Sequence, residues 1–477
     1  MEFEQIIGLE VHCELKTNSK MFSSAPVTFG KEPNSMMNEI DMGMLGTMPV
    51  LNKRSVELAI RVCHALHMDI DEVLCFDRKN YYYADLPKGF QITQYRRPLG
   101  KNGYLDIEVD HVTTRIQIER LHLEEDTAKQ IHYNDYSLID YNRAGIPLIE
   151  IVTCPDIRNA KQAAAYLEKL RQIFLYTDVS DAKMEEGSMR CDVNISLRPF
   201  GCDSYGTRTE IKNVNSISYV QKAIEFEAKR HEELLRCGKS VLQETRRFDE
   251  TINETITMRT KSDAIDYRYY PEVNILPIHI DHQWVLDIKK QLPLMAEDRE
   301  KIYIEKHGLS KREAHFIVSS KEISDFYEET IQFCQDFQKI YHWLSGEVQS
   351  YLNNHHCTIY QTKLKPIYLS QLIQYIKEDV ISSQQSKQVF DCVMKEGKAP
   401  EVIIQELDLR QILDSDVIEE IVNHVLDVNA SSIQDYIQGK KKVIGFLMGQ
   451  IMKESKGQVN PKMANQILIQ SLQKRTQ

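Results

Sequence analysis

One segment of the chain carries arginine, acid and amide side chains at the spacing of a β-strand. Polar and apolar residues alternate over residues 190–198, so Arg190, Asp192 and Asn194 share one face of a predicted strand. A guanidinium, a carboxylate and a carboxamide side by side can bind a metal ion, a phosphate or both. We therefore interpret this segment as a half-buried strand with one chemically active face.

The start of the chain has the same alternating pattern over residues 7–16. Glu10 and His12 lie on its polar face, where a carboxylate and an imidazole two residues apart can both reach one divalent cation. An ordinary polar strand face would show the same spacing, and the pattern alone favours that simpler interpretation. A metal site here needs further ligands from elsewhere in the chain.

Three consecutive carboxylates follow a histidine in the segment from His122 to Asp126. Like charges repel, so such a run is costly to bring together unless a cation lies near it. A solvated acidic turn explains the sequence equally well. The segment is nevertheless a candidate source of the missing ligands.

An aromatic and basic loop is predicted over residues 76–89. It contains Lys79, Tyr81 and Tyr82 among other tyrosines and cations. Such a loop can stack a nucleobase or a sugar beside positive charges that bind phosphate. A turn whose tyrosines pack on the core is the alternative, and the sequence leaves both open.

Helices and further strands must position these segments. One helix is predicted to begin after the N-cap residue Asn159 and a second near Ser216, each with the apolar spacing of a helix that covers a sheet. Strands are predicted over 148–152 and 207–214, and the second carries Lys212 on a polar face. This order indicates an α+β layer whose helices cover the apolar face and leave the polar face open for ligand.

The composition is that of a soluble globular protein with several domains. At 477 residues the chain is too long for one compact core, so two or three domains are expected. The net charge of −11 argues against a nucleic-acid-binding protein that is basic over its whole surface, although a local basic patch remains compatible with it. No signal peptide and no apolar stretch of membrane-spanning length is evident, so we expect a cytoplasmic protein without a membrane partner.

The ten cysteines are scattered singly, without a Cys-x-x-Cys pair. This spacing fits neither a zinc knuckle nor a disulfide framework. We therefore expect reduced thiols and no zinc.

The character of the sequence changes after about residue 292. Glycine becomes scarce, helical spacing dominates, and the clearest internal breaks are Pro366 and residues 397–400. We therefore expect three domains: one over residues 1–292 that carries the chemistry, a helical connecting domain over 293–400, and a helical tail over 401–477.

The end of the chain is strongly basic. From Gly439 onward there are eight lysine and arginine residues and a single acidic residue, Glu454. One sign of charge over a whole subdomain favours binding of a polyanion over a merely solvated tail. The lysines assigned to this role are Lys440, Lys441, Lys442 and Lys453.

Several long motifs, in matching order, resemble one protein family. They are IGLEVHCELKT, FDRKNYYY, RLHLEED, YNRAGIPLIEIV, KMEEGSMRCDVNISLRP, GTRTEIKNVNS, QETRRFDE, DYRYYPE and GKKKVIGFLMGQIMKESKGQVNP. Together they resemble the GatB family, the B subunits of the tRNA-dependent amidotransferase, over nearly the whole chain. The resemblance implies a cradle-like α+β catalytic domain with a mainly antiparallel sheet and flanking helices. It also implies an all-α linker region and a small helical tail, similar to YqeY domains, that binds tRNA.

The resemblance further implies a reaction and its partners. ATP with Mg²⁺ would phosphorylate the side-chain carboxylate of Glu-tRNA(Gln), Asp-tRNA(Asn) or both, and ammonia would then displace the phosphate. A separate amidase subunit, GatA, would supply ammonia, and a small subunit, GatC, would complete a heterotrimer. The alternative, of a different class, is a non-catalytic tRNA-binding adaptor of the same complex whose former kinase site is structural.

This reaction needs a site that gathers two anions and neutralises the charge that develops between them. By resemblance, the catalytic and Mg²⁺-binding residues are Glu10, His12, Glu125 and Asp192. Asp192 either binds the metal or contacts a residue that does. On chemical grounds, the residues assigned to ATP or the aminoacyl carboxylate are Lys79, Arg190, Asn194 and Lys212. Tyr81 and Tyr82 are assigned to the acceptor end of the tRNA.

The sequence departs from the family pattern in three loops. Leu45 stands where the family has proline, Thr127-Ala128 where it has Ala-Gly, and Val273-Asn274 where it has Pro-Asp. None of these changes removes a proposed ligand. They alter loop geometry and raise the hypothesis of a diverged second copy with altered tRNA preference.

Overall fold

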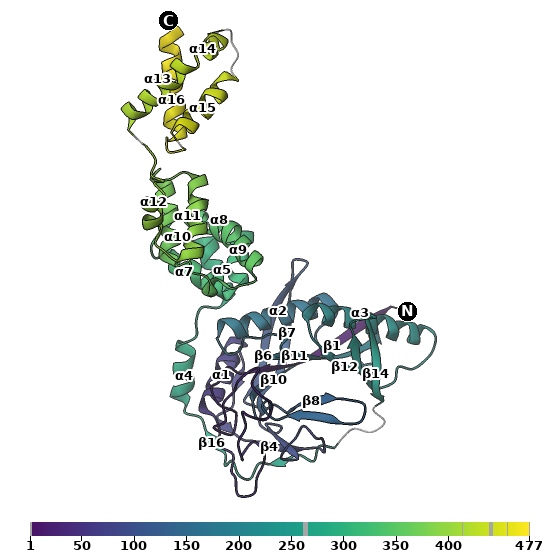
Figure 1. The fold of residues 1–477 in the computed structure, drawn as a ribbon. Helices are drawn as coiled ribbons and strands as arrows, with labels where there is room; N and C mark the ends of the chain where they lie inside the picture. Colours follow the sequence, from purple (N-terminus) through teal and green to yellow (C-terminus); the bar gives the residue numbers. More distant parts are fainter. Residues whose placement is uncertain (1, 261–265, 413, 438–441, 456, 477) are drawn as a thin grey trace. The chain divides into compact units, whose positions relative to one another are not determined.

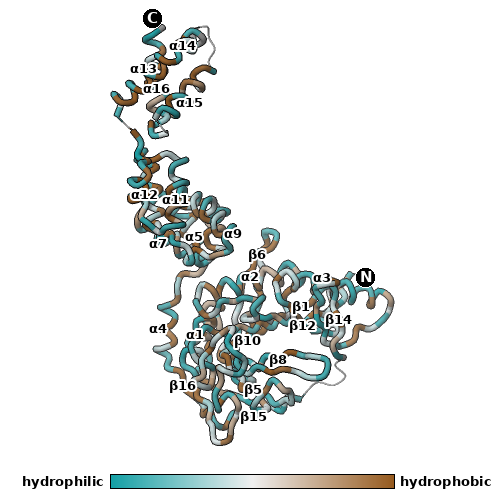
Figure 2. The backbone as a smooth tube through the Cα atoms, in the orientation of Figure 1, coloured by the Kyte–Doolittle hydropathy of each residue, from teal (hydrophilic) through white to brown (hydrophobic). Residues whose placement is uncertain are grey.

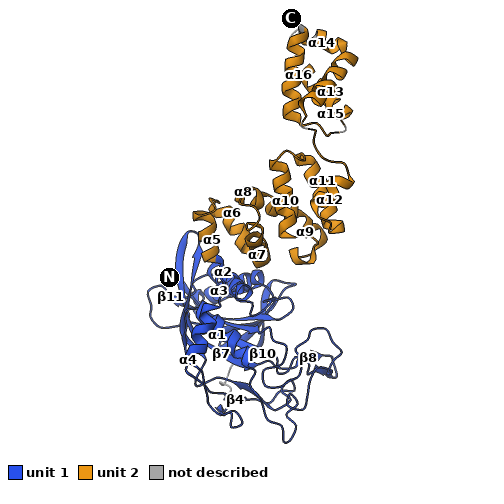
Figure 3. Ribbon diagram, turned by 90° about the vertical axis from the view of Figure 1, so that its left-hand side faces the viewer, with its two compact units in different colours: residues 1–296 blue, residues 297–477 orange. Residues whose placement is uncertain are grey.

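The computed structural model describes residues 2–260, 266–412, 414–437, 442–455 and 457–476. The chain divides into two compact units, Met1–Ala296 and Glu297–Gln477 (Figure 3). The first unit combines a large sheet with helices, whereas the described part of the second is helical apart from its turns and loops. The predicted α+β class is therefore confirmed, and the predicted end of the first domain at residue 292 lies close to this division.

A nine-stranded sheet is the frame of the first unit (Figure 1). Its strand order is β14-β13-β12-β11-β1-β10-β7-β6-β2, and all neighbours are antiparallel except the parallel pair β12 and β13. The strands are β1 (Phe3–Glu14), β2 (Asp69–Ile70), β6 (Gly100–Val109), β7 (Val112–Glu125), β10 (Pro147–Thr153), β11 (Met189–Pro199), β12 (Thr209–Val214), β13 (Glu244–Asp249) and β14 (Glu254–Thr260). The two alternating segments of the sequence, β1 and β11, are therefore direct neighbours at the centre of the sheet.

Helices cover the apolar face of this sheet. The apolar residues of β1, among them Ile7, Leu9 and Val11, are fully buried in one core that includes apolar residues of the helices. The helices of this unit are α1 (Lys53–Ala65), α2 (Ala160–Tyr176), α3 (Ile217–Arg236) and α4 (His282–Lys290). The predicted N-cap Asn159 and the predicted helix start near Ser216 are confirmed, and each of these residues accepts a hydrogen bond from a backbone N–H of the first helical turn.

Three small sheets lie beside the large one. They consist of β4 (Asp77–Asn80), β5 (Phe90–Thr93) and β15 (Tyr270–Pro271), of β3 (Val73–Leu74) and β16 (Ile278–His279), and of the hairpin β8 (Lys129–His132) and β9 (Ser137–Asp140). The interpretation of residues 76–89 as a loop was therefore wrong at β4. This strand lies between β5, which follows closely in the chain, and β15, which comes nearly two hundred residues later. Its four residues, Asp77 to Asn80, are all polar or charged, so no apolar face marked them as a strand.

The long loop predicted over residues 17–50 contains no helix or strand among its residues, all of which the structure describes. A buried ion pair anchors it, with Lys20 Nζ 3.1 Å from Asp41 Oδ2. The hydroxyl of Ser23 donates to the other oxygen of Asp41 at 2.6 Å. The loop is thus fixed by polar contacts in place of regular secondary structure.

The second unit is a succession of short helices, along which polar and apolar stretches alternate (Figure 2). They are α5 (Ala296–Glu305), α6 (Lys311–Ser319), α7 (Lys321–Thr330), α8 (Phe337–Trp343), the π-helix η1 (Leu344–Val348), α9 (Gln349–His355), the 3₁₀ helix η2 (Ile359–Gln361), α10 (Pro366–Lys377), α11 (Ser383–Glu396), α12 (Pro400–Glu406), α13 (Ser415–Val428), α14 (Ala430–Ile437), α15 (Val443–Glu454) and α16 (Pro461–Thr476). A separate apolar core forms near the end of the chain around residues such as Val422, Leu447 and Leu468.

Two further expectations concern the whole chain. All ten cysteines lie in the described part of the chain and are free thiols. Within that part, every helix is too short or too polar to cross a lipid bilayer.

Candidate functional site

The polar face of the large sheet gathers charged side chains from neighbouring strands. On β1, His12 lies opposite Arg190 of β11 on one side and opposite Glu150 of β10 on the other. Glu150 in turn lies opposite His122 of β7. Residues opposite each other in an antiparallel pair project to the same face. The four strands therefore present one continuous polar surface.

Three residues of this surface are placed to bind one cation, and we call them the cation triad: His12, Glu124 and Glu150. One ligand atom from each lies within 4.8 Å of the other two. His12 Nε2 is 3.2 Å from Glu150 Oε2 and 3.9 Å from Glu124 Oε1. Carboxylate oxygens suit Mg²⁺ and Mn²⁺, and an imidazole can complete such a set. The donor chemistry of the triad therefore fits a divalent cation.

A second imidazole, that of His122, lies against the same carboxylates. Its Nε2 is 3.4 Å from Glu150 Oε2 and 3.7 Å from Glu124 Oε2. Burial opposes its charged form, but Glu150 and Glu124 raise the pKa of His122 to about 9. They also raise the pKa of His12 against burial. The imidazolium of His122 thus offsets part of the charge of the two carboxylates, and a divalent cation in the triad would offset more of it.

Four residues predicted from the sequence lie together beside the triad, on β1, β11 and β12. Asn194 Nδ2 donates to Glu10 Oε1 at 2.9 Å, and burial is the main cause of a raised pKa at Glu10. Lys212 Nζ donates to Asp192 Oδ2 at 2.7 Å and lies 3.2 Å from Glu210 Oε1. Although burial opposes it, Asp192 and Glu210 raise the pKa of Lys212, so this lysine stays charged.

Arg190 lies at the other end of the same face, in a cluster of acids and a second arginine. Its Nη2 is 2.7 Å from Asp126 Oδ2, and Arg143 Nε is 3.7 Å from the same oxygen. Burial, followed by the charge of Asp126, raises the pKa of Glu14 to about 8. The guanidinium of Arg190 is therefore held in place by a carboxylate and not by the triad.

The structure separates Glu125 from the triad. Consecutive strand residues project to opposite faces, so Glu124 joins the polar face and Glu125 turns away from it. Lys88 Nζ donates to Glu125 Oε2 at 2.6 Å, and the backbone N–H of Ile92 donates to Oε1 at 3.0 Å. Among the described residues, the triad includes none of the predicted ligands except His12.

Sequence reasoning did not select Glu150, and within the acidic run it selected Glu125, whereas the triad contains Glu124. Glu150 is the single charged residue of the apolar strand Leu148 to Val152, and a lone carboxylate in a buried strand was the available signal. Glu124 is two residues from His122, so the strand period placed both on one face. Those two signals together would have selected the observed pair of carboxylates.

Lys79 lies next to the triad and is surrounded by tyrosine rings. Its Nζ is 5.2 Å from the ring centroid of Tyr267 and 5.9 Å from that of Tyr81. Burial opposes its charge, but Glu124 contributes to a raised pKa of Lys79. Tyr82, in contrast, is fully exposed. The structure thus brings together Lys79 and Tyr81 and leaves the side chain of Tyr82 in solvent.

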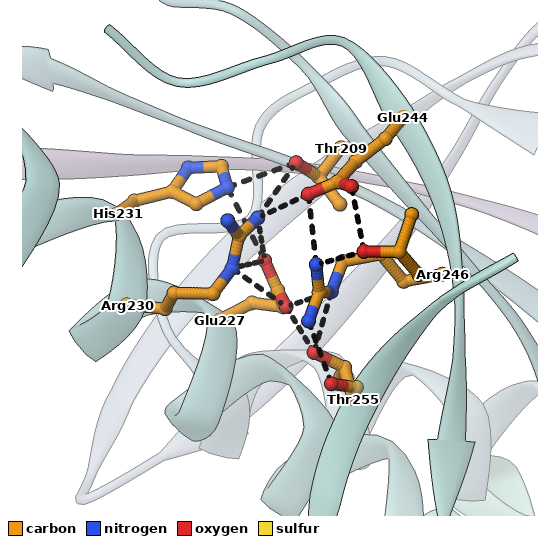
Figure 4. A network of polar contacts seen from close by, with 8 residues as sticks. Thr209, Glu227, Arg230, His231, Glu244, Arg246 and Thr255 are labelled. Carbon is orange, nitrogen blue, oxygen red and sulfur yellow. Dashed lines mark hydrogen bonds and ion pairs between the residues drawn. The ribbon is translucent and has the colours of Figure 1, made fainter. Parts of the chain in front are cut away.

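A buried ion network lies between α3 and the strands β12, β13 and β14 at one end of the large sheet (Figure 4). Its centre is Glu227 of α3, whose side chain is fully buried. Arg230 Nη2 is 2.7 Å from Glu227 Oε2, and Arg246 Nε is 2.9 Å from Oε1. Thr245, the strand neighbour of Arg246, donates to Glu210 on the polar face at 2.9 Å. The network therefore fixes the strands that carry Lys212 and its partners.

The basic tail is described only in part. Lys440 and Lys441 lie outside the described residues. Lys442 and Lys453 are exposed, just before α15 and near its end. Exposure leaves both ammonium groups available to an anionic partner.

Comparison with known proteins gives full-length matches. The family model described as the GatB/GatE catalytic domain matches residues 5–286, and the GatB domain matches residues 325–472. The chain is 50% identical over 475 residues to the B subunit of the aspartyl/glutamyl-tRNA(Asn/Gln) amidotransferase of Staphylococcus aureus strain MRSA252. It is equally similar to the corresponding protein of strain N315, and in both comparisons 100% of each chain is covered.

Proposed function

The chain belongs to the family of aspartyl/glutamyl-tRNA(Asn/Gln) amidotransferase B subunits, and from this membership we propose that it carries the ATP-dependent transamidation site of that enzyme. The observation that supports this proposal is the cation triad of His12, Glu124 and Glu150 on a sheet face that also carries lysines and an arginine. Carboxylates that bind a metal and cations that bind phosphate are what phosphoryl transfer requires.

The proposed reaction has two steps. An oxygen of the side-chain carboxylate of Glu-tRNA(Gln) or Asp-tRNA(Asn) attacks the γ-phosphorus of ATP, the bond to the β-γ bridging oxygen breaks, and ADP leaves. Ammonia then attacks the acyl carbon, phosphate leaves with the acyl oxygen, and one proton is released from nitrogen. The first step is needed because oxide is a poor leaving group whereas phosphate is a good one.

The triad is the proposed Mg²⁺ site, with Glu124 and Glu150 in place of Glu125. Bound there, Mg²⁺ would neutralise phosphate charge and align the transferred group. Within this set, His12 must be neutral to act as a ligand, and His122 can remain protonated and hold both carboxylates in place. Glu10 and Asp192 remain proposed residues beside the metal ligands.

The cations around the triad are proposed to hold the two anionic substrates. Lys79 is the candidate for a phosphate oxygen, because its strand β4 pairs with β5, whose Thr93 donates to Glu124 of the triad at 3.2 Å. Lys212 and Arg190 are candidates for the aminoacyl carboxylate or further phosphate oxygens, with Asn194 as a neutral donor. Lys212 and Arg190 are each already paired with a carboxylate, so a substrate anion would exchange partners with an acid of the protein.

The proposed partners follow from the name of the relatives, which describes one component of a multi-subunit enzyme with tRNA substrates. We propose GatA as the amidase subunit that supplies ammonia and GatC as the small third subunit, acting in the cytoplasm. Lys442 and Lys453 are the described members of the basic tail that we propose to contact tRNA.

The test uses the chain assembled with its amidase and small subunits. With ATP, Mg²⁺ and glutamine, Glu-tRNA(Gln) should be converted to Gln-tRNA(Gln), Asp-tRNA(Asn) to Asn-tRNA(Asn), or both. Conversion of neither substrate would reject the proposal. The adaptor alternative is separated by ATP cleavage, which the aminoacylated tRNA should stimulate in an active subunit and leave unchanged in an adaptor.

A further inference from the structure

Two tyrosine rings near the triad form an exposed, parallel stack. The ring centroids of Tyr95 and Tyr269 are 4.0 Å apart, and the ring planes differ by only 5°. The side chain of Tyr95 is nevertheless 59% exposed. Because Tyr269 covers one face of this ring, the exposed area lies on its other face and rim. The pair therefore presents a flat aromatic surface to solvent.

The backbone that carries Tyr95 is held by a buried carboxylate. Asp77 Oδ2 accepts hydrogen bonds from the backbone N–H groups of Tyr95 and Arg96, both at 3.0 Å. Asp77 Oδ1 is also 3.2 Å from Nε of Arg96. A surface fixed in this way binds a flat ligand without first losing conformational freedom.

The segment that carries Tyr269 is fixed to β4 in the same manner. The side chain of Asn80 donates to the carbonyl of Arg268 at 2.8 Å, and its backbone N–H donates to the carbonyl of Tyr267 at 2.9 Å. Arg78 makes two hydrogen bonds to Glu272, whose side chain is fully buried. Strand pairing of Arg78 with Tyr270 completes the attachment.

Tyr267 connects this surface to the cations and carboxylates of the candidate site. Its ring centroid is 5.9 Å from that of Tyr269, and Lys79 Nζ is 5.2 Å from it. The strand of Lys79, β4, pairs with β5, and the hydroxyl of Thr93 on β5 donates to Glu124 of the cation triad at 3.2 Å. The order along the site is therefore flat aromatic surface, ammonium group and metal-binding carboxylates. An adenosine nucleotide has a matching order of purine, phosphate and metal-bound phosphate.

We propose that Tyr95 and Tyr269 form the platform on which the adenine ring of an adenosine nucleotide stacks, with Lys79 on the side of its phosphate. The inference rests on the proposed function, because that reaction brings two adenosines to the site. One belongs to ATP and the other is the 3′-terminal nucleotide of the aminoacylated tRNA. Stacking on aromatic rings is the common means of holding a base without reading its edges.

The chain offers a matched control for this platform. Tyr133 and Tyr136 form another stack, with centroids 4.8 Å apart, and both rings are exposed. This second pair lies at the turn between β8 and β9, where none of its described contacts joins it to Lys79 or the triad. Loss of a ring there removes the same kind of surface contact without touching the proposed platform.

The experiment measures the kinetics of the assembled complex with the variants Tyr95→Leu and Tyr269→Leu, and with Tyr136→Leu as the control. Loss of a stacked base typically corresponds to a change in binding of about fivefold or more. We therefore expect the KM for ATP or the KM for the aminoacylated tRNA to rise by about that factor in both platform variants. Tyr95→Phe and Tyr269→Phe keep the rings and should remain close to the unaltered complex, as should the control.

The outcome identifies the source of the adenosine. A rise confined to the KM for ATP assigns the platform to ATP, and a rise confined to the KM for tRNA assigns it to the terminal nucleotide. The platform is refuted if the unaltered complex is active and both Leu variants keep both KM values within about twofold, because loss of stacking produces a larger change. In that case the proposed function still stands. An unaltered complex that cleaves no ATP with either tRNA would overturn both.

Discussion

The ion network around Glu227 makes a quantitative prediction for stability (Figure 4). Burial alone would raise the pKa of this carboxyl, but hydrogen bonds from His231 and Arg230, the largest of several, lower it from 4.5 to about 2. The unfolded chain therefore binds a proton at this group more readily than the folded chain does. The ionised group thus stabilises the fold above the unfolded pKa, and that stability is lost as the pH falls through the folded pKa.

The magnitude follows from the difference between the two pKa values. The two pKa values differ by about 2.5, and a difference of one in pKa corresponds to about 1.4 kcal/mol. The ionised carboxylate therefore contributes about 3 kcal/mol to the free energy of unfolding at neutral pH. Glu227→Gln removes this contribution and leaves Arg230 and Arg246, both mostly shielded from solvent, with Glu244 as the carboxylate that they share. We expect the free energy of unfolding of the first unit to fall by about 3 kcal/mol or somewhat more at pH 7. The difference from the unaltered chain should shrink as the pH falls from 4.5 towards 2.

The assay is urea unfolding of the full chain followed by tryptophan fluorescence. The chain has two tryptophans, Trp284 in the first unit and Trp343 in the second. In a Trp343→Phe background, the remaining tryptophan reports on the first unit, and the midpoint and slope give its free energy of unfolding. Measurements at pH 7, and at several pH values below 4.5, cover the range over which the difference should change.

A matched control lies on the same helix. Glu232 pairs with Arg236 at 2.6 Å, but both side chains are exposed, so Glu232→Gln should cost less than about 1 kcal/mol. The reasoning fails if Glu227→Gln costs no more than this control at pH 7. It also fails if the cost of Glu227→Gln does not decrease at low pH.

Two further predictions concern metal and tRNA. Binding of Mn²⁺ to the purified chain, followed by electron paramagnetic resonance, should weaken by about tenfold or more in Glu124→Gln and change little in Glu125→Gln, since only Glu124 belongs to the triad. The reverse order would restore the assignment made from the sequence. Replacing Lys442 and Lys453 by glutamine should weaken tRNA binding and reduce its logarithmic salt slope by about one for each lysine that contacts a phosphate. A slope that does not change would indicate a solvated tail.

The sequence by itself determined the central part of the site. Strict alternation on β1 and β11 follows from burial of one face, and the same alternation assigned Glu10, His12, Asp192 and Asn194 to the opposite face. The N-cap Asn159 and the helix start near Ser216 were readable because helix starts depend on a few consecutive residues. Fold class and family could likewise be inferred from local patterns and ordered motifs.

Only the tertiary structure decided which of these residues meet. Alternation along β7 puts Glu124 on the face of His122, but Glu124 meets Glu150 and His12 because β7 pairs with β10 and β10 pairs with β1. Register is set by packing of the whole sheet, which no single segment encodes. The pairing of Tyr95 with Tyr269 brings together rings that are 174 positions apart, and it depends on the attachment of β15 to β4. Spacing along the chain reveals the chemistry available on each strand, whereas pairing between distant strands decides which groups act together.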